Sequence, residues 1–248
     1  MKYNYQMDNL KNLIENYQPN QAAIEVVRRT KIVLLVGISG AGKDTLKRRL
    51  LEDNEFADIV SYTTRQPRRN AGVMETPGVD YHFIDDMAAV EMLENHEFIE
   101  AKFVHGTVYG TGAKEIQAIA EAGKIAVTDI DVQGVSEYKK LSGDVVAIFL
   151  LPPNYDEWRR RLRARYASDA EFEAEWPKRF NSAIKELTHA LEVPYYHFVL
   201  NDDLVESTRI VRAIASKPDI YNRKDDEARL AARDLLEELL KRNEDERK

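Results

Sequence analysis

The chain has 248 residues, of which 44% are hydrophobic and 32% charged, and its net charge is −7 at pH 7. This length suits one large domain with subdomains, and the negative charge argues against a general nucleic-acid binder. The absence of cysteine excludes disulfides, thiolate zinc sites and cysteine nucleophiles. The polar first residues lack the apolar core of a signal peptide, and no apolar run approaches the ~20 residues that span a bilayer. We therefore expect a soluble, cytoplasmic protein without a membrane partner.

Residues 1–30 are expected to form a helical extension, because Ile24, Val26 and Val27 make a weak apolar stripe. Short apolar runs then follow at 31–37, 124–130, 145–153 and 195–201. Continuous runs of this kind are typical of strands buried on both faces. Helix-like segments such as 43–51 and 156–165 separate most of them. The alternation predicts an α/β fold with a parallel sheet core, formed by residues 31–60, 113–156 and 181–216.

The remaining segments differ from this core. Residues 61–112 carry shorter strand-like pieces joined by loops, which predicts an inserted subdomain with a mixed sheet. Residues 157–180 are dense in arginine and acid, and we expect a mobile helical lid there. The C-terminal part, 217–248, predicts a charged helix whose apolar face carries Leu235, Leu236, Leu239 and Leu240. That face either packs on the domain or forms a homodimer contact.

The sequence GISGAGKDT at residues 37–45 has the pattern of a phosphate-binding loop. Its glycines let backbone N–H groups face phosphate oxygens, and Lys43 can reach the β and γ phosphates. A strand-like run precedes the loop and a helix-like run follows it, so the positive end of a helix would face the anion. We predict an ATP site formed by Gly37, Ser39, Gly40, Ala41, Gly42, Lys43, Asp44 and Thr45.

Asp44 stands where such loops usually carry the Ser or Thr that helps to hold Mg²⁺. Thr45 offers a hydroxyl one residue later, but that position lies about 100° around the helix and cannot simply replace the missing ligand. Asp44 would either cap the helix start, where negative charge is favoured, or bind a water of the Mg²⁺ shell. We predict Asp44 or Thr45 as the metal contact, through water.

A second anion site is indicated by SYTTRQPRR at residues 61–69. Arg65 and Arg68 can each bind phosphate through two N–H donors, although a basic run is also common on a solvated surface. Tyr81 and Tyr109 would add phenolic donors. Glu100 could accept two N–H donors from the Watson–Crick edge of guanine, whereas adenine would leave that carboxylate unpaired.

These motifs together resemble the guanylate kinases, P-loop nucleoside monophosphate kinases that phosphorylate GMP. The matching segments follow the family's order across residues 31–216: GISGAGK, SYTTRQPR, VDYHFI, FIEAKFVHGTVYGT, DIDVQG, RLRAR and NDDL. The resemblance implies a P-loop NTPase-type core, a GMP-binding subdomain and a helical lid, with ATP and Mg²⁺ as cofactors. It implies GMP contacts from Ser61, Arg65, Arg68, Tyr81, Glu100, Tyr109, Thr111, Asp129 and Asp131.

The resemblance also implies the groups that act on the transferring phosphate. These are Lys43 with the lid arginines Arg161, Arg165 and Arg179, while Asn201 would lie near the adenine. The arginine run at 158–165 has two other interpretations, a solvated helix face and a nucleic-acid patch. Asp129 and Asp131 would touch the ribose or base of GMP, organise Mg²⁺ waters, or merely cap the next helix.

The chain departs from the family pattern in several places. Ile38 replaces a usual proline, Asp44 replaces a small or hydroxyl residue, and the segments 69–78 and 167–178 carry extra residues. A ribose 1,5-bisphosphate phosphokinase would explain Asp44 but not the motifs around Arg65 and Glu100. A non-catalytic guanylate-kinase-like binding module would be expected to lose Lys43. The sequence favours direct, in-line phosphorylation of GMP and dGMP.

Overall fold

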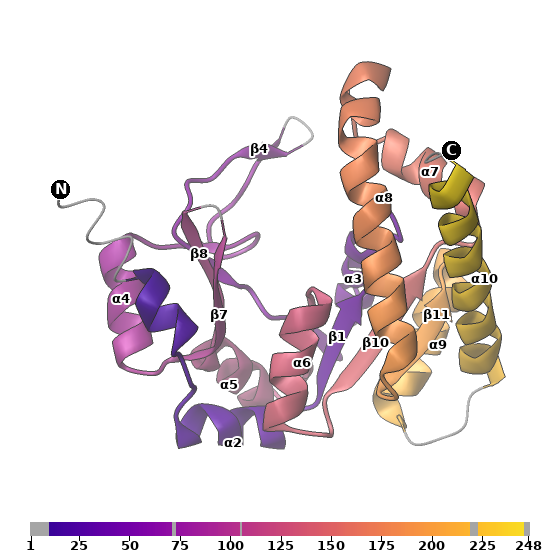
Figure 1. Cartoon of the computed structure of the whole chain (residues 1–248). Helices are drawn as coiled ribbons and strands as arrows, with labels where there is room; N and C mark the ends of the chain where they lie inside the picture. The colour runs from indigo at the N-terminus through magenta and orange to yellow at the C-terminus, as the bar shows by residue number, and fades with distance from the viewer. Residues whose placement is uncertain (1–9, 71–72, 105, 219–222, 246–248) are drawn as a thin grey trace. The chain divides into compact units, whose positions relative to one another are not determined.

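The computed structural model describes residues 10–70, 73–104, 106–218 and 223–245 (Figure 1). The first nine residues of the expected N-terminal extension therefore lie outside the described part. The chain divides into two compact units. Unit 1 comprises Met1–Ile32, Glu55–Thr128 and Ser136–Val145, and unit 2 comprises Val33–Asn54, Asp129–Val135 and Val146–Lys248. Among the described residues, no helix is both long and apolar enough to cross a membrane.

Parallel strands form the centre of unit 2. They are β1 (Ile32–Val36), β10 (Val146–Leu151) and β11 (Tyr196–Leu200), paired in the order β11-β10-β1. Every residue of β1 and β10 is buried, as expected for strands whose two faces are both covered. The strands expected at 31–37, 145–153 and 195–201 are thus confirmed, with ends that differ by one or two residues.

The helices of unit 2 follow these strands. They are α3 (Lys43–Leu51), α7 (Tyr155–Arg163), α8 (Asp169–Glu192), α9 (Leu204–Ser216) and α10 (Arg223–Asp245). The expected lid falls on α7 and the first half of α8. Its two tryptophans, Trp158 and Trp176, are buried with ring centroids 5.1 Å apart, so they pack the two helices together. Asn154 and Ser168 cap the starts of these helices through side-chain hydrogen bonds.

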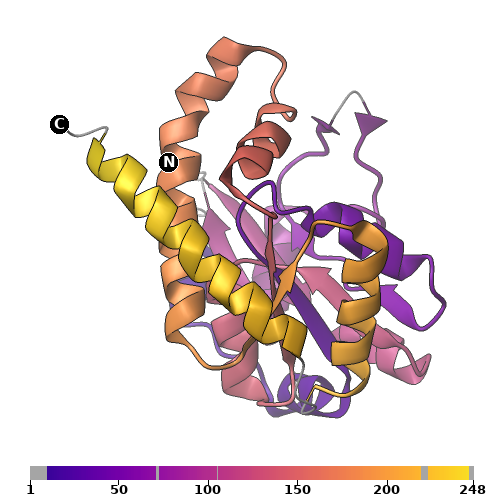
Figure 2. The same cartoon turned by 90° about the vertical axis from the view of Figure 1, so that its right-hand side faces the viewer.

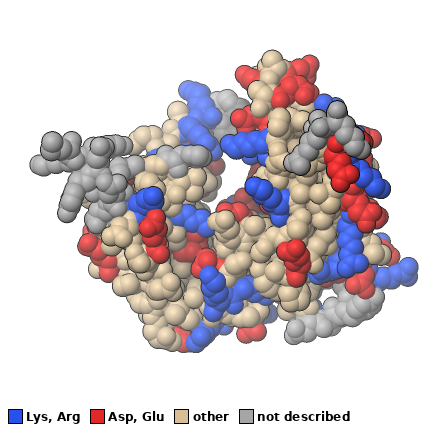
Figure 3. All heavy atoms as spheres, in the orientation of Figure 1, with Lys and Arg blue, Asp and Glu red and all other residues tan. Residues whose placement is uncertain are grey.

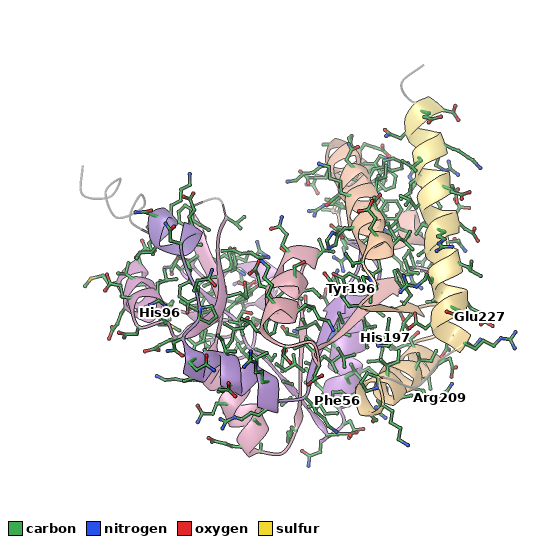
Figure 4. All side chains as sticks on the ribbon, turned by 60° about the horizontal axis from the view of Figure 1, so that its bottom comes forward. Phe56, His96, Tyr196, His197, Arg209 and Glu227 are labelled. Atoms are coloured by element: carbon green, nitrogen blue, oxygen red, sulfur yellow. The ribbon has the colours of Figure 1, made fainter. Side chains whose placement is uncertain are left out.

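The C-terminal helix α10 packs on β11 and α8 (Figures 1 and 2). Because β11 is an edge strand, its outward backbone groups need partners. Asp225 provides an acceptor for one of these groups, because its Oδ1 accepts a hydrogen bond from the Phe198 N–H at 2.7 Å. Its Oδ2 accepts a second hydrogen bond, at 2.8 Å, from Nδ1 of His197, which is labelled in Figure 4. Leu235 and Leu239 are buried and Leu240 is 43% exposed. The apolar face therefore packs on its own domain.

Unit 1 contains a mixed sheet, as the sequence predicts. Its strands are β3 (Tyr62–Thr63), β6 (His82–Phe83), β7 (Phe98–Val104) and β8 (Thr107–Gly112). Their order is β6-β3-β8-β7, with β3 parallel to β6 and the other pairs antiparallel. A bulge interrupts the β7–β8 ladder between Phe98 and Glu100. A separate two-stranded ribbon pairs β4 (Arg69–Asn70) with β5 (Val73–Met74).

The other elements of unit 1 include a second parallel pair, β2 (Phe56–Asp58) with β9 (Ile125–Asp129). This pair confirms the strand expected at 124–130. The helices of this unit, besides residues 10–15, are α2 (Gln21–Arg29), α4 (Asp86–Glu94), α5 (Ala113–Glu121) and the residues from 136 onward of α6 (Val132–Leu141). Asn20 and Asp85 cap α2 and α4.

The role of Asp225 at the edge of β11 can be tested against its neighbour. Replacing Asp225 with Ala leaves the Phe198 N–H without its acceptor, and we expect the free energy of unfolding to fall by ~2 kcal/mol. Asp226→Ala is the matched control, because both acids lie in the first turn of α10 and Asp226 is exposed. It should cost less than ~0.5 kcal/mol in urea unfolding. Equal losses in the two variants would mean that only the charge at the helix start matters.

Candidate active site

The turn from β1 to α3 requires glycine at defined positions. Gly37, Gly40 and Gly42 have φ angles of 141°, 90° and 94°, in a region that other residues rarely adopt. A Cβ on Gly37 would lie 2.3 Å from the Leu150 carbonyl oxygen, and a Cβ on Gly42 would lie 2.3 Å from Asn201 Nδ2. The backbone of this loop is therefore left bare for an approaching anion, as the phosphate-loop motif predicts.

Two side chains from distant elements hold the loop in place. Asn201, which follows β11, donates from Nδ2 to the Ala41 carbonyl oxygen at 2.8 Å, and both residues are buried. Trp158 of α7 donates from its indole nitrogen to the Ser39 carbonyl oxygen at 2.7 Å. These bonds hold two carbonyl groups of the loop from other elements, and fixed geometry of this kind is the preorganisation that electrostatic catalysis needs.

Lys43 begins α3, and its side chain folds back over the loop. Its Nζ donates to the Gly37 carbonyl oxygen at 2.6 Å. Burial lowers the pKa of Lys43, while the carboxylates of Glu186, Asp129 and Asp44 oppose that shift. A phosphate oxygen is a stronger acceptor for an ammonium group than a neutral carbonyl is. The Lys43 ammonium group is thus placed to exchange the Gly37 carbonyl oxygen for a phosphate oxygen, which is the stronger acceptor.

The acids around Lys43 have different partners. Asp129 Oδ1 lies 2.9 Å from Lys47 Nζ. Burial raises the pKa of Asp129, but the charge and hydrogen bond of Lys47 together with the charge of Lys43 outweigh it, and the net shift is downward. Asp131 Oδ1 accepts from the Gly134 N–H at 2.7 Å, the bond of a helix cap at the start of α6. Both acids lie in unit 2. Their predicted contacts with GMP stay predictions.

Glu186 on α8 was not singled out by the sequence analysis. Its pKa is raised by burial, against the favourable charges of Lys43 and Arg179. Its Oε1 accepts from the Ser182 hydroxyl at 2.9 Å. Nothing in the sequence marks it, because it is one acid on a long charged helix.

The predicted lid arginines make different contacts in unit 2. Arg165 Nη2 lies 3.4 Å from Asp44 Oδ2, and both side chains are about half exposed or more. Arg161 donates to Glu157 at 2.6 Å and to the Asn201 carbonyl oxygen at 2.8 Å. Arg179 Nε donates to the Tyr166 hydroxyl at 3.2 Å. Of the three, Arg165 is the one that contacts the phosphate loop.

The start of α3 is compatible with a metal ion that arrives with a triphosphate. Gly42 is the N-cap and no side-chain hydrogen bond caps the helix, so Asp44 lies in the first turn without capping it. Asp44 and Thr45 are both exposed there. The described residues contain no group of three His, Cys, Asp or Glu that could hold a metal alone. Mg²⁺ with ATP needs few protein ligands, because phosphates and waters complete its shell.

The second predicted site lies in unit 1. Thr111 Oγ1 donates to Glu100 Oε1 at 2.9 Å, and these residues face each other across the β7–β8 ladder. Thr111 is buried, and Glu100 and Ser61 are half-buried. Tyr138 of α6 is buried nearby; its pKa is raised by burial and by the charge of Glu100. The carboxylate of Glu100 is thus oriented by a hydroxyl.

Arg65 is oriented by an acid that the sequence analysis passed over. Its Nη1 and Nη2 donate to the two carboxylate oxygens of Glu75 at 2.5 and 2.8 Å. Glu75 also accepts from the Arg68 N–H at 3.0 Å and lies 3.5 Å from Arg68 Nε. The guanidinium of Arg65 lies 4.8 Å from the Tyr81 ring centroid, and the Tyr81 and Tyr109 rings are 6.1 Å apart. One buried carboxylate therefore holds both predicted phosphate-binding arginines.

The family follows from the comparison with known proteins. A family model described as guanylate kinase matches residues 29–217. The chain belongs to the guanylate kinase family. It is 34% identical over 184 residues to the guanylate kinase of Methylobacillus flagellatus, covering 74% of this chain and 87% of the relative. With the guanylate kinase of Bdellovibrio bacteriovorus it shares 35% identity over 175 residues, covering 70% and 90%.

Other guanylate kinases extend the comparison. Guanylate kinase 1 of Oryza sativa subsp. japonica is 34% identical over 199 residues, and the match covers 79% of this chain but only 50% of that relative. A crystal structure of guanylate kinase from Anaplasma phagocytophilum superposes with a TM-score of 0.56 at 27% identity, covering 78% of this chain and 88% of that one. The expected fold class and family are thus confirmed, and the segments before residue 29 and after 217 lie outside the family match.

The link between Glu75 and Arg65 predicts a specific dependence of stability on pH. Hydrogen bonding from Arg65 lowers the pKa of Glu75 from 4.5 to about 2. A lowered folded-state pKa stabilises the protein fully above the unfolded-state value, and the contribution is lost as the pH falls toward 2. We expect Glu75→Gln to be less stable by ~2 kcal/mol near pH 7.

The measurement is urea unfolding of both proteins between pH 7 and pH 2. The difference in stability should be constant above about pH 5 and should shrink below it. Glu91→Gln, on the exposed face of α4, is the control and should follow the wild type at every pH. A difference that does not change with pH would rule out the ion pair as its source.

Proposed function

We propose that this chain transfers the γ-phosphoryl group of ATP to GMP, and also to dGMP. The observation that carries the proposal is the half-buried Lys43, whose side chain folds back over a glycine loop that hydrogen bonds from two other elements hold in place. The family assignment supports it. A retained loop lysine also weighs against a non-catalytic binding module.

In the proposed reaction ATP and Mg²⁺ are bound together as the donor substrate. The bare backbone of the loop and the N-terminal end of α3 would bind the phosphates. Bound Mg²⁺ would neutralise charge on the β and γ phosphates, with Asp44 or Thr45 contacting its waters. Lys43 and Arg165 would stabilise the charge that spreads over the transferring group. Asn201, through its bond to Ala41, would keep the loop in shape and border the adenine.

The acceptor GMP would be bound by unit 1. Arg65 and Arg68 would bind its phosphate with Tyr81 and Tyr109, and the ion pair to Glu75 would keep Arg65 oriented. Glu100, fixed by Thr111, would accept two N–H donors of guanine, with Ser61 beside it. In-line transfer needs no covalent enzyme intermediate. A cytoplasmic location and a homodimer contact through the terminal helices remain predictions from the sequence.

The donor site is tested by a substrate panel together with a loop variant. ADP release should occur with GMP and dGMP, and not with AMP or ribose 1,5-bisphosphate. Lys43→Ala should lower kcat at least about 100-fold, because a charge-stabilising donor is lost. Lys185→Ala, an exposed lysine of α8, is the control and should keep full activity. Activity confined to ribose 1,5-bisphosphate would overturn the proposed function.

The base-reading role of Glu100 is tested by Glu100→Gln. The amide can accept at only one atom, so kcat/KM with GMP should fall about 100-fold, through loss of a charged hydrogen bond. The preference for GMP over AMP should fall by a similar factor. Glu94→Gln, an exposed acid at the end of α4, should change neither value. An unchanged preference in Glu100→Gln would remove Glu100 from base recognition.

A further inference from the structure

Residues 10–18 lie before the part of the chain that the family model matches, yet they complete the core of unit 1. Leu10 is fully buried in a cluster with Ala89, Leu93, Phe98 and Val108. Leu13, Ile14 and Tyr17 pack on the same cluster. Figure 1 shows this short helix in indigo beside α4. A segment this well packed is an integral part of the unit.

Tyr17 makes a directed contact with the backbone of β7. Its hydroxyl donates to the Phe98 carbonyl oxygen at 2.6 Å. Its ring meets the Phe98 ring edge-on, with centroids 6.3 Å apart and planes at 77°. Burial is the main cause that raises the pKa of Tyr17, so the hydroxyl keeps its proton and remains a donor. The bond therefore fixes the first residue of β7 from outside the sheet.

A second bond ties the same segment to the chain just before β7. His96, labelled in Figure 4, donates from Nδ1 to the Gln18 carbonyl oxygen at 2.6 Å. Its ring lies 5.8 Å from that of Tyr17. Among the described residues, His96 is the one non-glycine residue with a positive φ, 55°. That conformation is costly for a residue with a Cβ, and contacts such as these hold it in place.

These bonds converge where β7 bulges. The ladder with β8 shifts register between Phe98 and Glu100, so Ile99 is the extra residue. Bulges re-aim the side chains that follow them. The direction of the Glu100 carboxylate, two residues after Phe98, thus depends on how the bulge is held. Thr111 holds one oxygen of the Glu100 carboxylate by a hydrogen bond. The bulge determines the direction in which β7 presents the Glu100 side chain.

We propose that residues 10–18, through the hydrogen bond from Tyr17 to the Phe98 carbonyl, position Glu100 for the guanine edge of the acceptor. Tyr17 is then a positioning residue for base selection that lies outside the family region. The proposal rests on the base-reading role of Glu100 given above. It deepens that role by naming the segment that sets the geometry of the carboxylate.

The test uses a variant that removes one atom. Tyr17→Phe keeps the ring packing and loses only the hydroxyl. Leu13→Ala is the matched control, because Leu13 packs on the same cluster and makes no bond to β7. Each protein is compared with the wild type in kcat/KM for GMP and for AMP, in KM for ATP, and in thermal midpoint.

We expect Tyr17→Phe to lower the GMP-over-AMP ratio of kcat/KM about fivefold, the effect of one lost hydrogen bond, mainly through KM for GMP. KM for ATP should not change. Leu13→Ala should lower the thermal midpoint and leave the ratio unchanged. An unchanged ratio in Tyr17→Phe, or an equal change in Leu13→Ala, would overturn the proposal. Calorimetric binding of GMP and AMP gives the same comparison without turnover.

Glu100→Gln distinguishes a failure of the base-reading role of Glu100 from a failure of the positioning role of Tyr17. If Glu100→Gln leaves the ratio unchanged, the base-reading role fails and this proposal fails with it. If Glu100→Gln lowers the ratio and Tyr17→Phe does not, the positioning role fails alone. In the double variant Tyr17→Phe should add no further loss, because the group that it positions is already gone. Fully additive losses would contradict the proposal.

Discussion

The glycine loop of unit 2 depends on the half-buried ammonium group of Lys43. Lys43 is half-buried and burial lowers its pKa, so its charged form depends on groups that the fold supplies. The Gly37 carbonyl oxygen accepts a hydrogen bond from the ammonium group, and the carboxylates of Glu186, Asp129 and Asp44 favour its charged form. The loop can reach this arrangement only because glycine occupies its strained positions. It keeps the arrangement because Trp158 and Asn201 hold its carbonyl groups from α7 and from the end of β11.

In both predicted sites, an arginine side chain forms an ion pair with a carboxylate. Arg65 is paired with a buried Glu75, whereas Arg165 and Asp44 meet at the surface, where solvent screens the pair. The first pair fixes a side chain, and the second is weak enough to exchange partners. Among the described residues on the face drawn in Figure 3, both Lys and Arg side chains and Asp and Glu side chains are present.

The sequence predicted the parts of this molecule that depend on local pattern. Apolar runs marked β1, β9, β10 and β11, because a strand buried on both faces leaves few polar positions. The spacing of the glycines predicted the phosphate loop, because a backbone that turns its N–H groups toward an anion needs the positive φ angles that glycine readily adopts. The apolar stripe on the tail predicted a helix that either packs on the domain or forms a homodimer contact, and the structure shows α10 packed on α8 and β11.

The residues that the sequence missed are those whose partners lie far along the chain. Glu75 falls in a stretch that reads as an insertion, and only the fold brings its carboxylate to Arg65. Glu186 is one acid among many on α8. For Asp131 the sequence predicted several roles, and the structure adds its bond to the Gly134 N–H, while the predicted contact with GMP stays a prediction. Tyr17 and Phe98 are separated by 81 positions, and no periodicity links them.

The packing of Leu10 and Tyr17 limits where the chain can be truncated without removing part of the core of unit 1. Homology would place the start of the domain at residue 29, and a recombinant fragment designed on that boundary would lack both side chains. Phe98, Leu93 and Val108 would then face water on one side, and an apolar patch of that kind invites self-association. The smallest piece that folds as this chain does is therefore longer than the piece that its relatives define. The evolutionary and physical limits of the domain differ by the helix at residues 10–15, the loop that follows it and nearly all of α2.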